Sequence, residues 1–238
     1  MKNSLKTLAL PAALLLSTGA QAEGSFFGSA TATSDYRLFG LSQTLEDPAI
    51  QLEAGYDAGN GFFIGGFVSN VDFTPDDDPA DGGEKLEADL FVGYDLALSE
   101  TVSLTTTLIQ YTYTGTYSGE DYDYAEIIFD LNTAFGTVTV GQSLDDFLGD
   151  LGADKALRVE YNHSIALADS GISLDLQLAH YDTDDAFGDS YNYYTVGFSG
   201  DLGPIGVSVG YNGTDSDGKD LFGDIADSTA FLSLTKEF

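Results

Sequence analysis

Carboxylates are the chemical groups that this 238-residue sequence supplies in excess: it has 39 acidic side chains against eight basic ones, two histidines and no cysteine. The lack of cysteine excludes a thiolate metal site, a cysteine nucleophile, a disulfide scaffold and a lipoprotein anchor. The formal net charge of −31 argues against a nucleic-acid partner, because phosphate binding requires clustered Lys and Arg. The chemistry to expect is therefore that of acids and cations.

His163 and His180 are the only imidazoles, and they fall in different segments of the chain. Ser164 follows His163, and an outer-membrane hydrolase would need such a Ser/His pair. Neighbouring residues of a strand point to opposite faces, so these two side chains do not face each other. No G-x-S-x-G, H-E-x-x-H or phosphate-loop motif is present. We expect no enzyme and interpret both histidines as interfacial residues, with a hydrolase as the alternative.

One acidic segment spaces its carboxylates as calcium loops do. Asp215, Asp217 and Asp220 alternate with other residues, and Gly218 lies at the expected bend. The segment lacks the bidentate Glu and the full twelve-residue spacing, so a solvated loop is the alternative. We expect no tightly bound cofactor, only Ca²⁺ or Mg²⁺ held loosely by acidic external loops.

Most other acids follow a regular alternation with apolar residues. Ile50, Leu52 and Tyr56 share one parity, while Glu53 and Asp57 share the other, which predicts a strand with one apolar and one polar face. The same pattern recurs along the chain, and the polar parity carries nine acids against two bases. The charged residues that we expect to line or constrict a pore are Glu53, Asp57, Lys85, Glu87, Asp89, Glu126, Asp130, Arg158, Glu160 and Asp175, with Lys85 and Arg158 cross-linking acids.

About twelve alternating segments must position these side chains. They are long for a globular protein but suit tilted strands that cross a membrane. No helical periodicity of useful length follows residue 22. The predicted strands are 25–36, 48–59, 61–73, 84–98, 101–114, 122–135, 137–146, 155–168, 171–183, 189–202, 204–214 and 228–238.

The connections alternate strictly between short and long. Short turns, such as Gly59-Asn60 and Gly203, follow even-numbered strands, whereas longer, mostly acidic segments follow odd-numbered ones, including 75–83, 115–121, 147–154, 184–189 and 214–227. Outer-membrane barrels have short periplasmic turns and longer external loops. A soluble sandwich or lipocalin-like barrel also alternates, but it would bury its apolar parity inside.

Both ends of the sequence favour export to the outer membrane. Lys2 and Lys6, an apolar run and Ala20-Gln21-Ala22 predict a signal peptide over residues 1–22, with an uncleaved anchor as the alternative, and a barrel over 23–238. The apolar run is too short to cross a bilayer as a helix. Phe238, after alternating apolar residues, resembles the closing strand that the barrel-assembly machinery recognises.

Four short segments in the first third of the sequence form a recognisable pattern. They are Ser34-Asp35-Tyr36-Arg37-Leu38-Phe39-Gly40-Leu41-Ser42-Gln43-Thr44, then Pro48-Ala49-Ile50-Gln51, then Gly61-Phe62-Phe63-Ile64-Gly65, then Ser69-Asn70-Val71-Asp72. This pattern resembles the TorF-type porin family of Gram-negative outer-membrane proteins. The family usually has a second Arg where this chain has Phe39. The resemblance implies an outer-membrane barrel and a porin role, without naming a substrate.

Arg37 is the only base between the predicted signal peptide and Lys85. We expect it to pair with Glu53, Asp57 or Asp72, since an Arg–carboxylate fork would hold the first loop in place and narrow the pore. Direct recognition of a ligand is the alternative.

These observations predict an all-β, transmembrane, up-and-down antiparallel β-barrel of about 12 strands in the bacterial outer membrane. The predicted function is a narrow, cation-preferring diffusion channel for small solutes, because carboxylates in the lumen favour cations. The alternative is a closed structural or surface-interaction barrel. Expected partners are membrane lipid and lipopolysaccharide, the barrel-assembly machinery and small permeants. Adaptation to saline surroundings is a second explanation of the acid excess.

Overall fold

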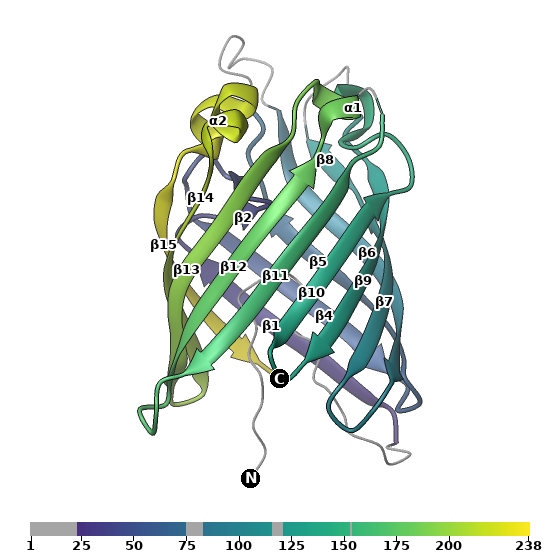
Figure 1. Ribbon diagram of the computed structural model, residues 1–238, viewed down its shortest axis with the longest axis vertical. Helices are drawn as coiled ribbons and strands as arrows, with labels where there is room; N and C mark the ends of the chain where they lie inside the picture. Colours follow the sequence, from purple (N-terminus) through teal and green to yellow (C-terminus); the bar gives the residue numbers. More distant parts are fainter. Residues whose placement is uncertain (1–22, 75–82, 116–120, 153) are drawn as a thin grey trace.

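The chain forms a closed antiparallel β-barrel in a computed structural model that describes residues 23–74, 83–115, 121–152 and 154–238 (Figure 1). Within these residues twelve strands make the wall, since β7 and β8 continue one another. The wall strands are β1 (Ser25–Thr33), β4 (Ala49–Asp57), β5 (Phe62–Asn70), β6 (Glu84–Ala97), β7 (Ser103–Tyr111) with β8 (Tyr113–Gly115), β9 (Tyr124–Thr133), β10 (Gly136–Ser143), β11 (Leu157–Ala166), β12 (Ile172–Asp182), β13 (Tyr191–Leu202), β14 (Ile205–Thr214) and β15 (Thr229–Glu237). The predicted strand number and fold class are confirmed.

The first and last strands close the barrel. β1 pairs antiparallel with β15, from Ser29 opposite Glu237 to Thr33 opposite Ser233. The backbone N–H of Phe238 donates to the carbonyl oxygen of Gly28 at 3.0 Å, which extends the seam to the last residue. Closure leaves no unpaired sheet edge across the seam.

The two ends of the barrel differ, as Figure 1 shows. The turn end carries the tight connections, among them Gly59-Asn60 and Gly203, together with the C-terminus. The loop end carries four short elements: α1 (Asp184–Phe187), α2 (Ser216–Phe222) and the 3-10 turns η1 (Gly149–Leu151) and η2 (Gly223–Ala226). The predicted signal peptide over 1–22 and most of the predicted loops over 75–83 and 115–121 lie outside the described residues.

The apolar parity faces outward and the polar parity inward. Along β4, Ile50, Leu52 and Tyr56 are exposed while Gln51 and Glu53 are partly buried. Phe26 and Leu90 are 86% and 73% exposed, as members of an apolar belt around the barrel. A lipocalin-like barrel would have the reverse arrangement, so the observed faces fit a barrel whose surroundings are apolar.

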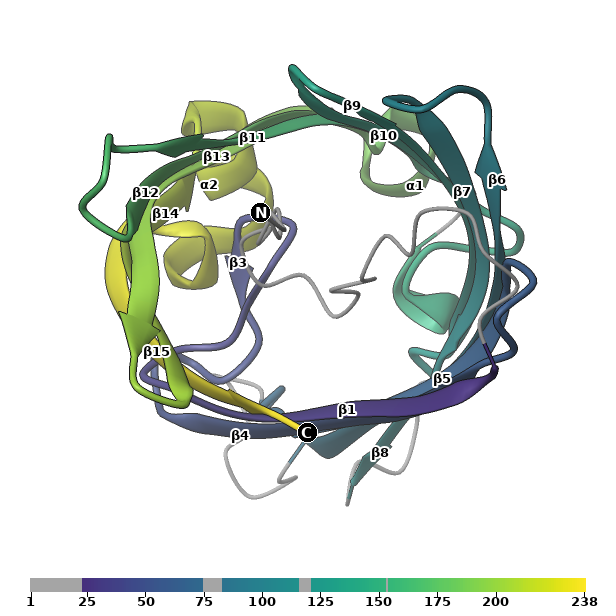
Figure 2. The same cartoon turned by 90° about the horizontal axis from the view of Figure 1, so that it is seen from below.

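Buried apolar side chains gather inside the barrel, mostly towards the loop end. They come from the wall, as with Tyr111 and Tyr181, and from a segment between β1 and β4 that folds into the lumen, as with Phe39. Figure 2 shows this segment inside the ring of strands. None of the helices in the described part of the chain is long and apolar enough to cross a membrane.

The two α-helices depart from the expectation of no helix after residue 22. α1 has four residues and α2 has seven, and both lie in predicted loops. Helices this short contain two turns or fewer, so they leave no repeating hydrophobic pattern in the sequence.

Candidate functional site

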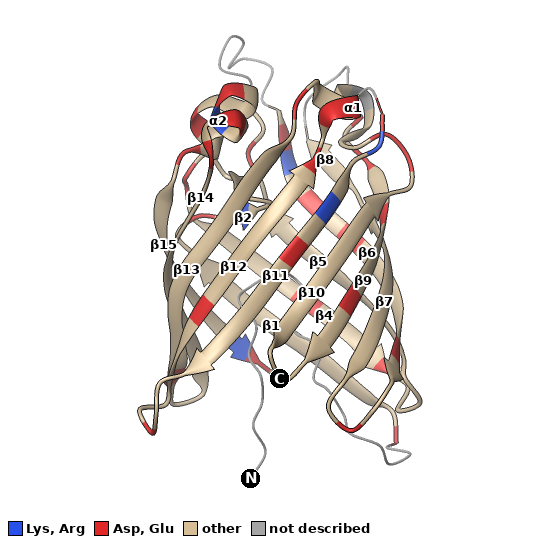
Figure 3. Ribbon diagram, in the orientation of Figure 1, with Lys and Arg blue, Asp and Glu red and all other residues tan. Residues whose placement is uncertain are grey.

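The inward face of the wall is strongly acidic. In the described part of the chain its carboxylates alternate with the outward apolar residues, and Figure 3 shows acids along the strands as well as at both ends. The acids on this face include Glu53, Asp57, Glu84, Glu87, Asp89, Asp95, Glu126, Asp130, Glu160 and Asp175, whereas Arg158 is the only base that faces inward from the described wall strands.

Lys85 is placed differently from the expectation that it lines the lumen. The pairing of β6 with β8 shifts register between Glu84 and Leu86, and this bulge interrupts the alternation. Lys85 is exposed and pairs with Asp72 near the loop end, rather than with a carboxylate of the lumen wall.

Between β1 and β4 the chain forms a small hairpin inside the barrel, made of β2 (Arg37–Leu38) and β3 (Leu41–Ser42). Its turn places Phe39 at φ 53° and Gly40 at φ 84°. Two consecutive positive φ angles define the turn type that matches the twist of a two-residue hairpin. Gly40 adopts this conformation freely, whereas Phe39 is strained there, so contacts elsewhere must hold its side chain.

Asp35 organises the hairpin from within. It is almost fully buried, and its carboxylate accepts hydrogen bonds from the Ser42 hydroxyl at 2.6 Å and from Arg37 Nη1 at 3.3 Å. The Thr44 hydroxyl donates to the carbonyl oxygen of Asp47 at 2.6 Å and so fixes the exit of the segment. Residues 34–44, the first of the segments that carry the TorF resemblance, therefore form a folded unit.

Arg37 does not pair with Glu53, Asp57 or Asp72, and that prediction is wrong. Its ion pair is with Asp35, two residues away, and its other donors reach Asn212 Oδ1 at 3.0 Å and the carbonyl oxygens of Gly40 and Asp227, each at 2.7 Å. The hydrogen bonds to Asn212 and Asp227 tie the hairpin to β14 and to the residue that follows η2.

Arg158 lies at the centre of the first acidic group of the lumen, the arginine cluster of Glu126, Arg158 and Glu160. Its Nε and Nη2 donate to the two oxygens of Glu126 at 2.8 and 3.1 Å, and its Nη1 donates to Glu160. The Tyr193 hydroxyl donates to Glu160 at 2.7 Å. A two-point Arg–carboxylate contact of this kind is among the stronger ion pairs in proteins, so the cluster is fixed and partly neutralised.

Phe39 lies against the arginine cluster. The guanidinium carbon of Arg158 is 4.9 Å from the centre of its ring, and the ring is 5.1 Å from that of Tyr181. The Tyr191 hydroxyl donates to the carbonyl oxygen of Phe39 at 3.1 Å. The tip of the hairpin is thereby attached to the β11–β13 side of the wall.

Glu87 and Asp89 form the second acidic group, the carboxylate pair on β6. Both are fully buried, and the Tyr36 hydroxyl of the hairpin donates to Glu87 Oε1 at 3.1 Å. The other oxygen of Glu87 and both oxygens of Asp89 have no hydrogen-bond partner among the described residues. No Lys, Arg or His in this described part pairs with either carboxylate. The hairpin thus contacts both acidic groups: the arginine cluster, which contains a base, and the carboxylate pair, which has none among the described residues.

The remaining predicted pore residues lie closer to the turn end, and they differ in whether they are hydrogen-bonded. The Thr139 hydroxyl donates to Asp130 at 2.5 Å, and the backbone N–H of Gly59 donates to Asp57 at 2.7 Å. Glu53 is partly buried on β4. Asp175 is buried on β12, and neither of its oxygens has a hydrogen-bond partner among the described residues.

The predicted calcium loop is folded as the start of α2. Asp215 is the N-cap: its side chain accepts from the backbone N–H of Gly218 at 3.2 Å and from Asn192 Nδ2 at 2.6 Å. Burial alone raises the pKa of Asp215, but these hydrogen bonds outweigh it and lower the pKa below its ordinary value. Asp217 and Asp220 do not join it: the described residues contain no group of three His, Cys, Asp or Glu arranged to hold a metal ion.

The two histidines lie on the outward parity. His163 stacks on Tyr161, with ring centres 6.2 Å apart, while Ser164 is on the opposite face of β11. His180 Nδ1 lies 3.0 Å from Asn192 Oδ1. The two residues His163 and Ser164 therefore do not form a catalytic pair.

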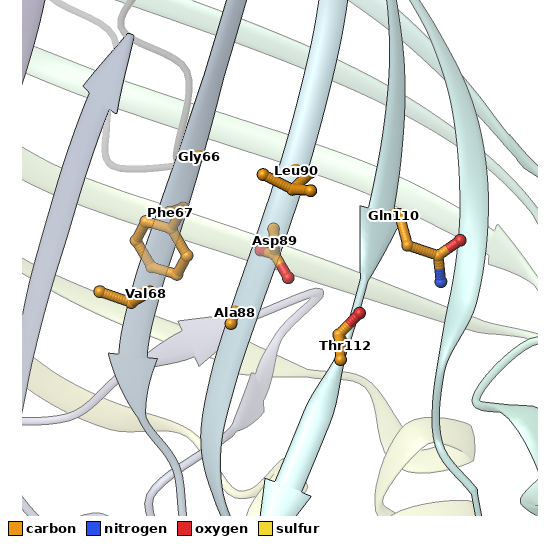
Figure 4. Close-up of a pocket in the computed structure, with 8 residues that line it drawn as sticks. All are labelled: Gly66, Phe67, Val68, Ala88, Asp89, Leu90, Gln110 and Thr112. Carbon is orange, nitrogen blue, oxygen red and sulfur yellow. The ribbon is translucent and has the colours of Figure 1, made fainter.

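A mostly apolar hollow of about 370 Å³ lies on the wall formed by β5, β6 and β7 (Figure 4). Gly66 and Ala88 leave space there between larger outward residues such as Val68 and Leu90. Its lining includes the polar residues Asp89, Gln110 and Thr112 but is otherwise apolar, so it offers few polar groups for a specific ligand.

Sequence reasoning missed Asp35, Tyr36 and Phe39 as parts of the site. The signal available was the local grouping of polar residues after β1, which includes Ser42 and Thr44. Alternation describes only regular strands, so it gave no information about a loop that turns inward.

Comparison with known proteins agrees with this architecture. A family model described as "Bacterial protein of unknown function (Gcw_chp)" matches residues 18–238. The chain is similar in structure to the NanC porin, at 12% identity and a TM-score of 0.55, over 90% of this chain and 99% of that one. It is also similar to an outer membrane channel from Pseudomonas putida F1, at 14% identity and a TM-score of 0.54, over 92% and 97% of the two chains. No curated protein matches.

Proposed function

The chain belongs to the Gcw_chp family of bacterial proteins of unknown function, and we propose that it is an outer-membrane channel with a narrow, cation-preferring bore for small solutes. The observation that carries this proposal is the inward face of the wall, where the carboxylates of the described strands greatly outnumber the single arginine. Carboxylates around a pore attract cations and repel anions. The fold, shared with the NanC porin, supports a channel, and the TorF resemblance supports the same role.

The hairpin sets the expected width of the bore. It lies inside the barrel and reaches opposite walls through Tyr36 and Phe39. Twelve strands are intermediate between barrels filled by side chains and wide porins, so a hairpin that spans the lumen leaves a small passage. We therefore expect low conductance with clear charge selectivity.

Selectivity is measured as the reversal potential of the refolded barrel in a planar bilayer under a KCl gradient. We expect K⁺ to be preferred over Cl⁻, and the combined change Glu53→Gln and Asp57→Asn to reduce the preference. Asp169→Asn is the matched control, because it removes a charge from an exposed turn rather than from the bore. A wild-type reversal potential that indicates anion preference would rule out the proposal.

A second candidate is a closed barrel with a structural or surface-interaction role. It is favoured by the buried cluster towards the loop end, where Tyr111, Tyr124, Phe147 and Tyr181 pack with the hairpin. If the barrel is closed, the wild type is silent in the bilayer and replacement of residues 37–42 by a Gly-Ser linker opens it. If the wild type conducts, the closed barrel is excluded.

The location and partners follow from the same proposal. Residues 1–22 direct export, and the turn end lies in the periplasm. The acidic loop end faces outward beside lipopolysaccharide, with loosely bound Ca²⁺ or Mg²⁺ between them. Phe238 at the closing seam is the residue that the barrel-assembly machinery reads. Removal of residues 1–22 is expected to leave the protein out of the outer-membrane fraction of cells, which fractionation and immunoblotting would measure.

A further inference from the structure

The carboxylate pair has acceptors that nothing in the described chain satisfies. Glu87 and Asp89 are 0% and 2% exposed, and three of their four oxygens have no hydrogen-bond donor among the described residues. Burial of an unpaired carboxylate is strongly unfavourable, so such a pair requires a cation or a proton. In the arginine cluster, Arg158 supplies the cation that the buried Glu126 and Glu160 require.

A tyrosine adds an independent indication of a ligand. Tyr113 on β8 is directly opposite Glu87 on β6, and its buried hydroxyl also has no hydrogen-bond partner within the described residues. Tyr36, already bonded to Glu87, supplies a second phenol oxygen on the hairpin side. Tyr36 contacts Glu87 directly and Tyr113 is its cross-strand partner, so both phenols belong to the surroundings of the carboxylate pair.

Aromatic rings border the same point. Phe67 on β5 pairs in register with Asp89, and the two residues lie on neighbouring strands in Figure 4. The ring centres of Tyr36 and Phe67 are 6.0 Å apart. Aromatic faces attract organic cations and also pack against their methylene groups.

We propose that Glu87 and Asp89, with Tyr113 and Tyr36, form a binding site in the lumen for a primary ammonium group. This deepens the proposed function by naming a solute class, and it rests on that proposal only in taking the lumen to be open to solutes. A primary ammonium has three N–H donors, one for each unpaired carboxylate oxygen. A calcium ion requires six to eight oxygen ligands, and the described residues hold no group of three ionisable metal ligands.

Equilibrium binding tests the site without reference to conductance. Ethylammonium is titrated into the refolded barrel in detergent and followed by ligand-observed NMR, with tetramethylammonium as the probe that carries the same charge but no N–H donor. We expect saturable binding of ethylammonium that is at least about tenfold tighter than that of tetramethylammonium, the size of one charge-assisted hydrogen bond.

Variants locate the binding. Glu87→Gln combined with Asp89→Asn removes both charges at nearly constant volume, and it should weaken ethylammonium binding at least about tenfold while the barrel still folds. Asp175→Asn is the matched control, because Asp175 is also a buried and unpartnered lumen acid but lies on β12; it should retain the discrimination between the two probes. Equal binding by wild type and the double variant would overturn the proposal, as would equal binding of the two probes.

The outcomes separate this inference from the proposed function. If the barrel conducts cations but does not distinguish the two probes, the ammonium site is refuted and the channel stands. If ethylammonium binds as expected but no current is measured, the site stands and the channel is refuted. Binding that the pair variants leave unchanged at pH 7, with the pair shown by isotope-edited infrared spectroscopy to hold a proton, assigns the proton as the occupant and overturns the ammonium site.

Discussion

The arginine cluster and the carboxylate pair lie in one lumen, are equally buried, and differ in what compensates their charge. Glu126 and Glu160 share Arg158, whereas Glu87 and Asp89 have no base among the described residues. The hairpin touches both groups, through Phe39 and Tyr36. Inward acids of the same parity can therefore form a structural cross-link where a base lies beside them. Where no base is near, their oxygens remain available to bind a ligand.

This difference has opposite consequences for stability. Removal of the base from a buried ion cluster leaves uncompensated charges, whereas removal of a charge from an unpaired group relieves a cost. A comparison of substitutions at the two groups separates these cases directly, with the free energy of unfolding in urea, measured on barrel refolded in detergent, as the common scale.

Arg158→Met is expected to have the largest effect. It leaves Glu126 and Glu160 buried without their partner, and it also removes the cation beneath Phe39, so the free energy of unfolding should fall by about 3–5 kcal/mol. Glu87→Gln, which removes a charge from the carboxylate pair, should leave stability unchanged or raise it. If the two substitutions destabilise equally, the distinction between the groups fails.

Gly141→Ala tests the geometry of the arginine cluster. A Cβ at Gly141 would lie 2.4 Å from Glu126 Oε1 and 2.6 Å from Arg158 Nε, both of them fixed in the ion pair. The pair must shift, and overpacking of this kind costs about 1–3 kcal/mol in the same unfolding measurement. Gly206→Ala is the control, since the nearest atom to its Cβ is 3.7 Å away. Equal effects at the two positions would contradict the prediction.

The strand pattern could be predicted from sequence because it depends on local alternation. Leu90 and Val92 point outward and alternate with the inward Asp89 and Phe91, as the period of two requires, and every predicted strand has its counterpart in the wall. The turn chemistry of Gly59-Asn60 was equally local. These features need no knowledge of which strands face each other across the lumen.

The site could be predicted only in part, because its contacts join distant residues. Glu126 and Arg158 are 32 residues apart and meet across β10, at the position where Gly141 leaves space. Parity placed both residues on the inward face without indicating that they meet. The bulge at Lys85 interrupts the alternation of inward and outward residues. The alternation also does not apply to the inward hairpin, because that segment is not a wall strand.

Two matched substitutions compare how far each group depends on its tyrosine. Tyr36→Phe removes the hydroxyl that donates to Glu87 Oε1 and should cost about 1–3 kcal/mol, the penalty of an unsatisfied buried acceptor. Tyr193→Phe removes the same donor from Glu160, but Arg158 and Gln177 still donate there, so the cost should be about 1 kcal/mol or less. Unfolding of both variants at pH 7 measures the difference. A larger loss for Tyr193→Phe would mean that the compensation by Arg158 is incomplete.

Asp215 provides a third case, a carboxylate outside the lumen that N–H donors stabilise in place of a base. Its lowered pKa means that the charged form is favoured by folding, so this stability is present above the ordinary Asp value of about 3.9 and is lost as the pH falls below it.

Asp215→Ala should destabilise by about 1 kcal/mol at neutral pH, as loss of an N-cap does, and Asp215→Asn by less, since the amide oxygen still accepts from Gly218. Hydrogen exchange of the α2 amides at pH 7 and pH 3 measures the effect locally. Protection at pH 7 should decrease in the order wild type, Asn, Ala, and the gap between wild type and Asn should narrow from pH 7 to pH 3. A gap of the same size at both pH values would show that the charge of Asp215 is not what stabilises the helix.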